Sequence, residues 1–285
     1  MIGFVNIDKP VGVTSFDVVR RVKRVLGTPH VGHLGTLDPL ASGVLPVAVG
    51  KATRLFDYFL DKDKEYVGEF IVGIETTTED VTGEILKTSE KRFSKEDLEK
   101  IVPKFIGEID QTPPKFSAKK INGERAYKLA RAQKDFELSS KKVKIYGIST
   151  ELDPRDNLLR LEICCRAGTY IRTLGSDICK ALGTVCAMKN LRRTRSGCFK
   201  IEDSMSLDEF EKTPKVVPIE SVLADVEKVE LDDDAFKKLK NGVKVFLDRK
   251  SDKEFFVFNN GILFCLAKMA NDGSIKVIAN LYEGE

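Results

Sequence analysis

The sequence contains few of the residues that build metal sites. It has only two histidines, His30 and His33, and its six cysteines form no Cys-x-x-Cys pair. The two histidines could reach one metal ion together, but no acidic or sulfur ligand flanks them. We therefore expect no metal site, and we expect the cysteines to be buried thiols in a reducing compartment.

Long apolar segments are also missing. No window reaches roughly eighteen consecutive apolar residues, so we expect no membrane-spanning helix. The N-terminal stretch lacks the charged leader and apolar core of a secretion signal, and we expect a cytoplasmic protein. The net charge of +3 permits a nucleic-acid partner without indicating one, because a basic face matters more than the total charge.

Several helices are predicted by spacing and by capping residues. Apolar side chains recur at helical spacing over 15–26 and 171–182, and capping-box patterns open helices at Ser94 and Ser206. The other face of the first helix is basic, which fits either a solvated surface or an RNA-facing one. That face carries Arg20, Arg21, Lys23 and Arg24.

Strand signals and their order indicate the fold class. Residues 66–74 and 159–165 predict strands, and strands and helices do not alternate as a regular βαβ series. We therefore expect an α+β fold with a central, mostly antiparallel sheet in a domain over 1–222. A small, mostly β domain is expected over 223–285. A basic arm over about 111–140, which ends in a short helix, is expected to project from the core.

One carboxylate has an unusual setting. Asp38 precedes Pro39 in "VGHLGTLDPLASGVLPVAVG", and an Asp-Pro pair is first of all a turn signal. The residue before proline is held extended, and the nearby glycines leave room for a close approach. Four apolar side chains would desolvate this carboxylate, so we expect a basic partner. These side chains are Leu37, Leu40, Val44 and Leu45.

The best candidate for that partner is Arg172. It follows Ile171 in "GTYIRT", displaced from the apolar face of the predicted helix but close to it. In one interpretation its guanidinium orients Asp38 and keeps the carboxylate ionised. The alternative is a solvated surface arginine, and the sequence alone does not bring the two residues together.

Five motifs together resemble one known family. In chain order they are "NIDKPVGVTSFDVV", "VGHLGTLDPLASGVLPVAVGKATR", "KEYVGEFIVGIETTTEDVTGEI", "TPPKFSAKKINGERAYKLAR" and "AGTYIRTLGSDICKALG". The chain resembles the TruB family of bacterial tRNA pseudouridine synthases, which modify uridine 55 in the T-loop. The resemblance covers about 3–220, and the last sixty residues resemble the PUA RNA-binding module of that family.

The resemblance implies a cofactor-free isomerisation, in which uracil is detached, rotated and rejoined to the ribose through C5. Asp38 matches the catalytic aspartate of the family, Arg172 its paired arginine and Tyr66 its active-site tyrosine. His33 matches the histidine that holds the T-loop. Tyr170 and Leu191 match residues that line the uracil pocket. The alternative for Tyr66 is a core aromatic at the start of a strand.

The resemblance also implies tRNA as the partner, and we expect a monomer. The 111–140 arm resembles an RNA-gripping insertion. The candidate phosphate contacts, each of which could equally be a solvated surface charge, are Lys9, Arg20, Arg21, Lys119, Lys120, Arg125 and Lys128.

Two other functions compete with the isomerase. One is a tRNA-binding or tRNA-folding protein in which catalysis is secondary, but such a protein has no need of Asp38, whose charge would repel RNA phosphates. The other is an aspartate-dependent hydrolase, which the sequence disfavours because it shows neither metal ligands nor a second paired acid.

Overall fold

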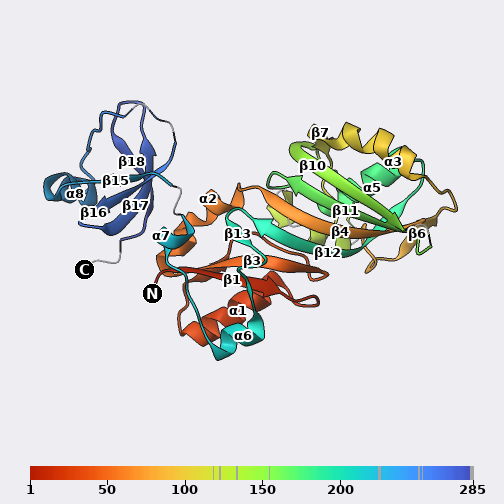
Figure 1. Cartoon of the computed structure of the whole chain (residues 1–285), viewed down its shortest axis with the longest axis horizontal. Helices are drawn as coiled ribbons and strands as arrows, with labels where there is room; N and C mark the ends of the chain where they lie inside the picture. Colours follow the sequence, from red (N-terminus) through yellow and green to blue (C-terminus); the bar gives the residue numbers. More distant parts are fainter. Residues whose placement is uncertain are drawn as a thin grey trace.

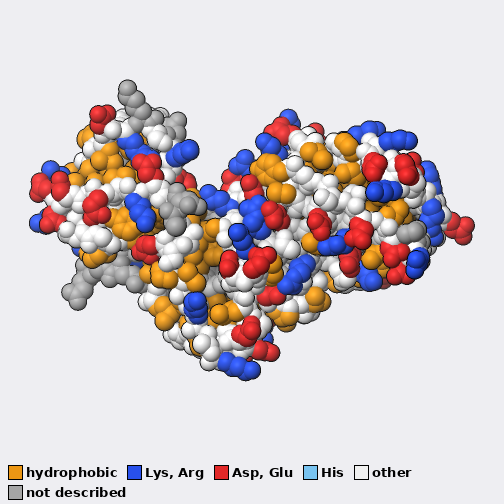
Figure 2. All heavy atoms as spheres, in the orientation of Figure 1, with side chains coloured by type: hydrophobic (Ala, Val, Ile, Leu, Met, Phe, Trp, Pro, Cys, Tyr) orange, Lys and Arg blue, Asp and Glu red, His pale blue; other side chains and the backbone are white. Residues whose placement is uncertain are grey.

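The computed structural model describes residues 1–117, 119–121, 123–132, 134–153, 155–223, 226–249, 251 and 253–282. Figure 1 shows a large sheet with helices packed around it, and a smaller β unit to one side that holds the end of the chain. No helix in these ranges is long and apolar enough to cross a membrane. Figure 2 shows acidic and basic side chains intermixed on the face in view, in keeping with the small net charge.

The large sheet is mixed but mostly antiparallel, as expected. Its order is β14-β1-β3-β12-β4-β11-β10-β7, with β2 paired to β3 and β13 paired to β12. Two pairs are parallel, β1 with β14 and β3 with β12. The strands are β1 (Gly3–Lys9), β2 (Val31–His33), β3 (Ala41–Val49), β4 (Lys64–Val72), β7 (Gly107–Gln111), β10 (Lys141–Asp153), β11 (Leu158–Cys165), β12 (Cys186–Ser196), β13 (Phe199–Lys200) and β14 (Met205–Ser206).

The strand expected over 66–74 lies two residues earlier, as β4. It begins at Lys64 because that residue still pairs with Ser196 of β12 and Cys165 of β11. It ends before Gly73, whose φ of 102° turns the chain out of the sheet. The strand expected over 159–165 is confirmed as β11.

The predicted helices are confirmed, and the capping boxes expected at Ser94 and Ser206 are present. The first helix, α1 (Ser15–Leu26), has a capping box between Thr14 and Asp17, and Gly27 closes it in the left-handed region. The other three are α3 (Lys95–Ile101), α5 (Ile171–Ala181) and α6 (Leu207–Lys212). Shorter elements are η1 (Gly50–Leu55), α2 (Phe56–Leu60), β5 (Ile74–Thr76), β6 (Ile85–Thr88), η2 (Val102–Phe105) and α7 (Ile219–Val222).

The arm over 111–140 leaves the sheet at the end of β7. Its described residues form the hairpin β8 (Lys120–Ile121) and β9 (Glu124–Arg125), and then the predicted short helix, α4 (Ala126–Arg131). The first part of the arm does not project, because Ser117 is buried and the Phe116 carbonyl accepts a hydrogen bond from the core.

The C-terminal β unit is the small, mostly β domain that we expected. It contains β15 (Lys228–Glu230), α8 (Asp233–Lys240), β16 (Phe255–Asn259), β17 (Ile262–Met269) and β18 (Ile275–Asn280). Leu266 of β17 belongs to the same apolar cluster as Phe4 and Phe59 of the large unit. Arg54 Nη1 also donates to the Asn280 carbonyl at 2.9 Å. The two units therefore share a core, while the boundary at 222 and the PUA-like assignment stay predictions.

Candidate active site

A cavity of about 480 Å³ opens where β4 and β12 meet the start of α5 and the loop between β2 and β3. Five residues that the sequence singled out line it: Asp38, Tyr66, Tyr170, Arg172 and Leu191. They come from distant parts of the chain. The same wall contains Lys64, Ser117 and Arg193, which sequence reasoning missed.

The backbone around Asp38 is fixed by hydrogen bonds on both sides. Ser15 Oγ accepts from the Leu37 N–H at 2.9 Å and donates to the Leu37 carbonyl at 3.0 Å, and Ala41 N–H donates to the Asp38 carbonyl at 3.0 Å. Gly35, with a φ of 138°, lets the loop pass close to Arg193. The turn that the Asp-Pro pair predicted therefore holds the backbone of Asp38 in one position.

The surroundings of the carboxylate differ from the expectation. Leu37, Val44 and Leu45 are buried within apolar clusters, and the Asp38 side chain keeps 42 % of its surface exposed. The apolar neighbours therefore do not desolvate the carboxylate. Val44 and Leu45 point to opposite faces of β3, and a separate apolar cluster covers each face, while Asp38 lies in the preceding loop and lines the cavity.

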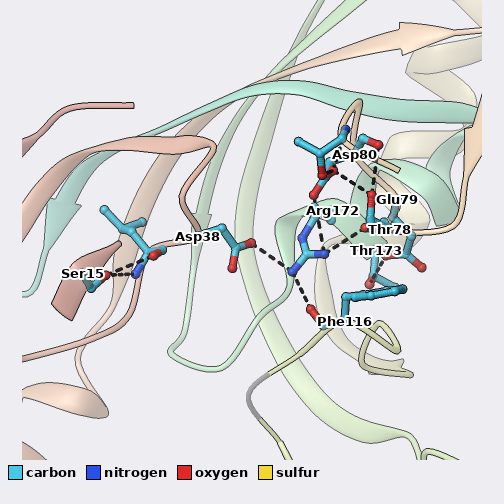
Figure 3. A network of polar contacts seen from close by, with 10 residues as sticks. Ser15, Asp38, Thr78, Glu79, Asp80, Phe116, Arg172 and Thr173 are labelled. Atoms are coloured by element: carbon cyan, nitrogen blue, oxygen red, sulfur yellow. Dashed lines mark hydrogen bonds and ion pairs between the residues drawn. The ribbon is translucent and has the colours of Figure 1, made fainter. Parts of the chain in front are cut away.

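The basic partner of Asp38 is Arg172, which confirms the predicted pair. Its Nη2 lies 2.9 Å from Asp38 Oδ2, and its side chain is only 6 % exposed. Nη1 also donates to the Thr78 carbonyl at 2.8 Å, and Nη2 donates to the Phe116 carbonyl at 3.1 Å (Figure 3). A guanidinium with this many partners cannot swing away, so it fixes the side of Asp38 that it touches.

A second carboxylate, missed in the sequence, supports Arg172 from the opposite side. Asp80 Oδ2 lies 3.7 Å from Arg172 Nη1, and the Asp80 side chain is 9 % exposed. Its Oδ1 accepts from Thr78 Oγ1 at 2.7 Å and from the Thr82 N–H at 2.9 Å. The available signal was the stretch "TTTEDVTG", in which threonines flank an acid that can close an Asx turn.

Tyr66 and Arg193 face each other across β4 and β12, where they are partners in register. Tyr66 is buried, and burial raises the pKa of its phenol above the usual value, so the hydroxyl stays neutral. Arg193 is buried as well, donating from Nε to the Val44 carbonyl at 2.7 Å and from Nη2 to the Gly35 carbonyl at 3.0 Å. Nothing in the local sequence "NLRRTRS" distinguishes Arg193 from the two arginines beside it.

Lys64 adds a further cation to the cavity wall. Its Nζ donates to the carbonyls of Lys62 at 2.7 Å and Leu60 at 3.0 Å. Burial, together with the charge of Arg193, lowers the pKa of Lys64 to about 8. The buried side of the cavity is thus lined by cationic groups, which favours an anionic or electron-rich ligand.

The other predicted pocket residues hold separate positions. The Tyr170 N–H donates to Gln111 Oε1 at 2.8 Å, and Gln111 Nε2 donates to the Tyr170 carbonyl at 3.0 Å. Leu191 is buried in the cavity wall. His33 is half-buried on β2 and is not one of the lining residues. Burial and the charge of Arg193 lower the pKa of His33.

The structure corrects the prediction for Lys9. Its side chain is fully buried, and Nζ donates to the carbonyls of Pro10 at 2.9 Å and Val13 at 2.8 Å. Since an ammonium enclosed in this way reaches no solvent, Lys9 is not a phosphate contact. Its role is to close the loop between β1 and α1.

The basic face of α1 is largely occupied by intramolecular ion pairs. Arg21 Nε lies 2.8 Å from Glu211 Oε1 of α6, and Arg24 pairs with the same carboxylate at 2.8 Å. Arg20 is exposed and pairs with Asp17. A helix whose basic side chains already bind acids of a neighbouring helix is a weaker candidate for an RNA-facing surface.

The predicted phosphate contacts of the arm lie at its surface. Lys120 and Arg125 are exposed in the β8–β9 hairpin, Lys128 is exposed on α4, and Lys119 is partly exposed. Of the cysteines, Cys165, Cys179, Cys186 and Cys265 are buried free thiols as expected, whereas Cys198 is exposed.

Family profiles match the chain in two adjacent blocks. Residues 23–171 match the N-terminal domain of the TruB family pseudouridylate synthases, and residues 172–229 match the tRNA pseudouridylate synthase B C-terminal domain. Among solved structures, a chain of a Cbf5-Nop10-Gar1 complex has a TM-score of 0.71 and 27 % identity, covering 96 % of this chain and 83 % of that one. A chain from an H/ACA RNP bound to a substrate RNA containing 2'-deoxyuridine also has a TM-score of 0.71, with 26 % identity over 98 % of this chain and 85 % of that one.

Curated relatives agree with these matches. A protein of Clostridium kluyveri named tRNA pseudouridine synthase B is 38 % identical over 286 residues, which is 98 % of this chain and 99 % of the relative. Its namesake in Listeria innocua is 42 % identical over 258 residues, covering 85 % of this chain and 84 % of the relative. With profiles, relatives and fold in agreement, this chain belongs to the TruB family of pseudouridylate synthases.

Proposed function

We propose that this protein converts uridine 55 in the T-loop of tRNA to pseudouridine. The observation that carries the proposal is an aspartate held by a buried arginine inside a cavity of about 480 Å³, a volume that suits a nucleoside. The names of the relatives support tRNA as the substrate. In this reaction the bond from C1' to N1 breaks, a bond from C1' to C5 forms, C5 loses its proton and N1 gains one.

Asp38 is the residue to which we assign the chemistry. Arg172 holds Oδ2, which leaves Oδ1 toward the cavity as the reacting oxygen. An ionised carboxylate suits attack on the ribose or on the uracil ring, and it also suits removal of a proton from the sugar. Each of these routes needs the charge that Arg172 stabilises.

Tyr66 is assigned to the base. Its ring can stack on uracil, and its neutral hydroxyl can take part in moving the proton at C5. A uridine stacked in a loop must be flipped out before it reaches such a site, which costs a few kcal/mol. Tyr170 and Leu191, in the same wall, are assigned to the contacts that offset this cost.

The remaining RNA contacts are assigned to the arm and to the C-terminal unit. Lys119, Lys120, Arg125 and Lys128 would reach phosphates of the loop, and His33 would hold the T-loop. The unit over 223–285 would act as a PUA-like module, with one copy of the chain binding one tRNA.

The test is tritium release from a tRNA transcript that carries 5-tritiated uridine, with wild-type protein and Asp38→Asn. We expect release by the wild type, none by Asp38→Asn, and equal RNA binding by both. A transcript with cytidine at position 55 should release no tritium. Binding without release by either protein would favour the tRNA-folding function instead, and cleavage of the RNA would favour a hydrolase.

A further inference from the structure

A lysine that the proposed function does not use lies at the rim of the cavity. Lys141 is the first residue of β10, and its Nζ lies 5.2 Å from the centroid of the Tyr170 ring. A Cβ added to Gly168, which has a φ of 82°, would lie 2.8 Å from that Nζ. Gly168 and Tyr170 both line the cavity, so the ammonium lies next to two residues of its wall, although Lys141 itself is not a lining residue.

The ammonium of Lys141 has no anionic partner in the described part of the chain. No hydrogen bond or ion pair is recorded for it there. The charge that acts on it is that of another cation, Lys119, whose Nζ donates to the Ser139 carbonyl at 3.1 Å and to Ser139 Oγ at 3.3 Å. Partial burial and the charge of Lys119 lower the pKa of Lys141. Because these two cations repel each other and no carboxylate is bonded to the Lys141 ammonium in the described residues, the site favours an anion from outside.

The other cations of the cavity are already engaged. Arg172 and Arg193 donate to backbone carbonyls, and so does Lys64. Lys141 differs from them because, in the described part of the chain, its ammonium donates to no carbonyl or carboxylate and its recorded contact is with the Tyr170 ring. It is therefore available to a ligand that approaches past Tyr170.

We propose that Lys141 binds a backbone phosphate next to the flipped uridine. This inference rests on the proposed function, because a base that enters the cavity brings its flanking phosphates to the rim. Lysine binds phosphate as a point charge, and Lys119 on the arm would strengthen the same site. Lys141 is thus a positioning residue, which fixes the nucleotide while Asp38 acts on it.

The competing explanation is that Lys141 only supports the Tyr170 ring through its cation–π contact. The first experiment compares Lys141→Met and Lys141→Arg with wild-type protein in tRNA binding at several salt concentrations. Lys142→Met is the matched control, since Lys142 is exposed on the opposite face of the same strand. We expect Lys141→Met to weaken binding about 10-fold and to flatten the salt slope by about 0.7 to 0.9. Lys141→Arg should restore both values, and Lys142→Met should change neither.

The second experiment identifies the phosphate. A T-loop hairpin RNA carries a neutral methylphosphonate at either phosphate beside the target uridine. If Lys141 binds that phosphate, one of these replacements weakens binding to wild-type protein about 10-fold but does not weaken binding to Lys141→Met any further.

Two results would overturn the inference. One is an unchanged salt slope of tRNA binding in Lys141→Met. The other is that each methylphosphonate weakens RNA binding to Lys141→Met as much as it weakens binding to wild-type protein. These readouts concern affinity, whereas the proposed function is tested by tritium release from tRNA. The two failures are therefore distinguishable.

Discussion

Arg172 Nη2 lies 2.9 Å from Asp38 Oδ2, and the two partners differ sharply in exposure: 6 % for the arginine side chain and 42 % for the aspartate. The fold buries the cation among backbone carbonyls and leaves the anion open to the cavity. Because of this asymmetry, the Asp38 carboxylate can contact a substrate while it stays paired with Arg172.

Replacement of Arg172 is expected to damage both folding and turnover. Arg172→Met leaves the carbonyls of Thr78 and Phe116 without their donor, and it leaves Asp38 without its partner. We expect a loss of about 3 to 5 kcal/mol in the free energy of unfolding and at least a 100-fold loss in turnover. Urea unfolding and tritium release measure these effects. Arg160→Met is the control, because its ion pairs with Glu151 and Glu162 are exposed and should contribute about 1 kcal/mol or less.

Asp80→Asn is expected to slow turnover through Arg172. The amide keeps an oxygen for the Thr82 N–H but removes the charge that lies 3.7 Å from Arg172 Nη1. We expect kcat to fall about 10-fold with KM little changed, and the free energy of unfolding to fall by about 1 to 3 kcal/mol.

Asp272→Asn is the control for that variant. Asp272 accepts from the Ser274 N–H at 3.1 Å in a similar turn of the C-terminal unit. The Asp272→Asn variant should lose stability but keep the wild-type kcat. An Asp80→Asn protein with wild-type kcat would show that Arg172 needs no second carboxylate.

Stability at acidic pH is expected to depend on His33. Burial and the charge of Arg193 lower its pKa in the folded protein, whereas the pKa of the imidazole in the unfolded chain is about 6.5. Below that pH the unfolded state binds more protons, so this contribution to stability is complete above about pH 6.5 and is lost as the pH falls through the folded pKa.

We therefore expect His33→Gln to lose less stability than wild-type protein between about pH 7.5 and pH 5.5. Urea unfolding at both pH values measures the difference. The only other histidine, His30, is exposed and provides the control, since His30→Gln should follow the wild type. Identical pH profiles for all three proteins would contradict the assignment.

The shared core between the two units is expected to make them unfold together. Leu266 of β17 is fully buried in the apolar cluster that contains Phe4 and Phe59. Leu266→Ala should cost about 2 to 5 kcal/mol, and the transition should stay single in both tryptic digestion and circular dichroism. Ile262→Ala, on the same strand but exposed, should cost about 0.5 kcal/mol or less. Early loss of the C-terminal unit alone would show that the contact is weak.

Much of this protein could be predicted locally. The capping boxes at Thr14, Ser94 and Ser206 determined where three helices begin, because each depends on residues only three positions apart. The Asp-Pro pair likewise predicted the turn that mounts Asp38. Alternation along β11 predicted that strand to within one residue.

Other features depended on which strands became neighbours. Lys9 reads as a surface charge in the sequence, yet the loop that follows β1 folds back over it and supplies two carbonyls. Arg193 is one of three arginines in "LRRTR", and its position opposite Tyr66 follows only from the register of β12 on β4. The role of Asp80 follows only from the packing of its loop against α5, which places it next to Arg172.

What the sequence by itself determined were the elements, their ends and the residue types that can carry the chemistry. Tertiary structure alone decided that Arg172 meets both Asp38 and Asp80, and that Lys141 meets Tyr170 at the cavity rim. The physical reason is the separation along the chain over which each kind of interaction acts. Capping and periodicity act over a few residues, whereas these contacts join segments whose proximity depends on strand register and on the burial of a common core.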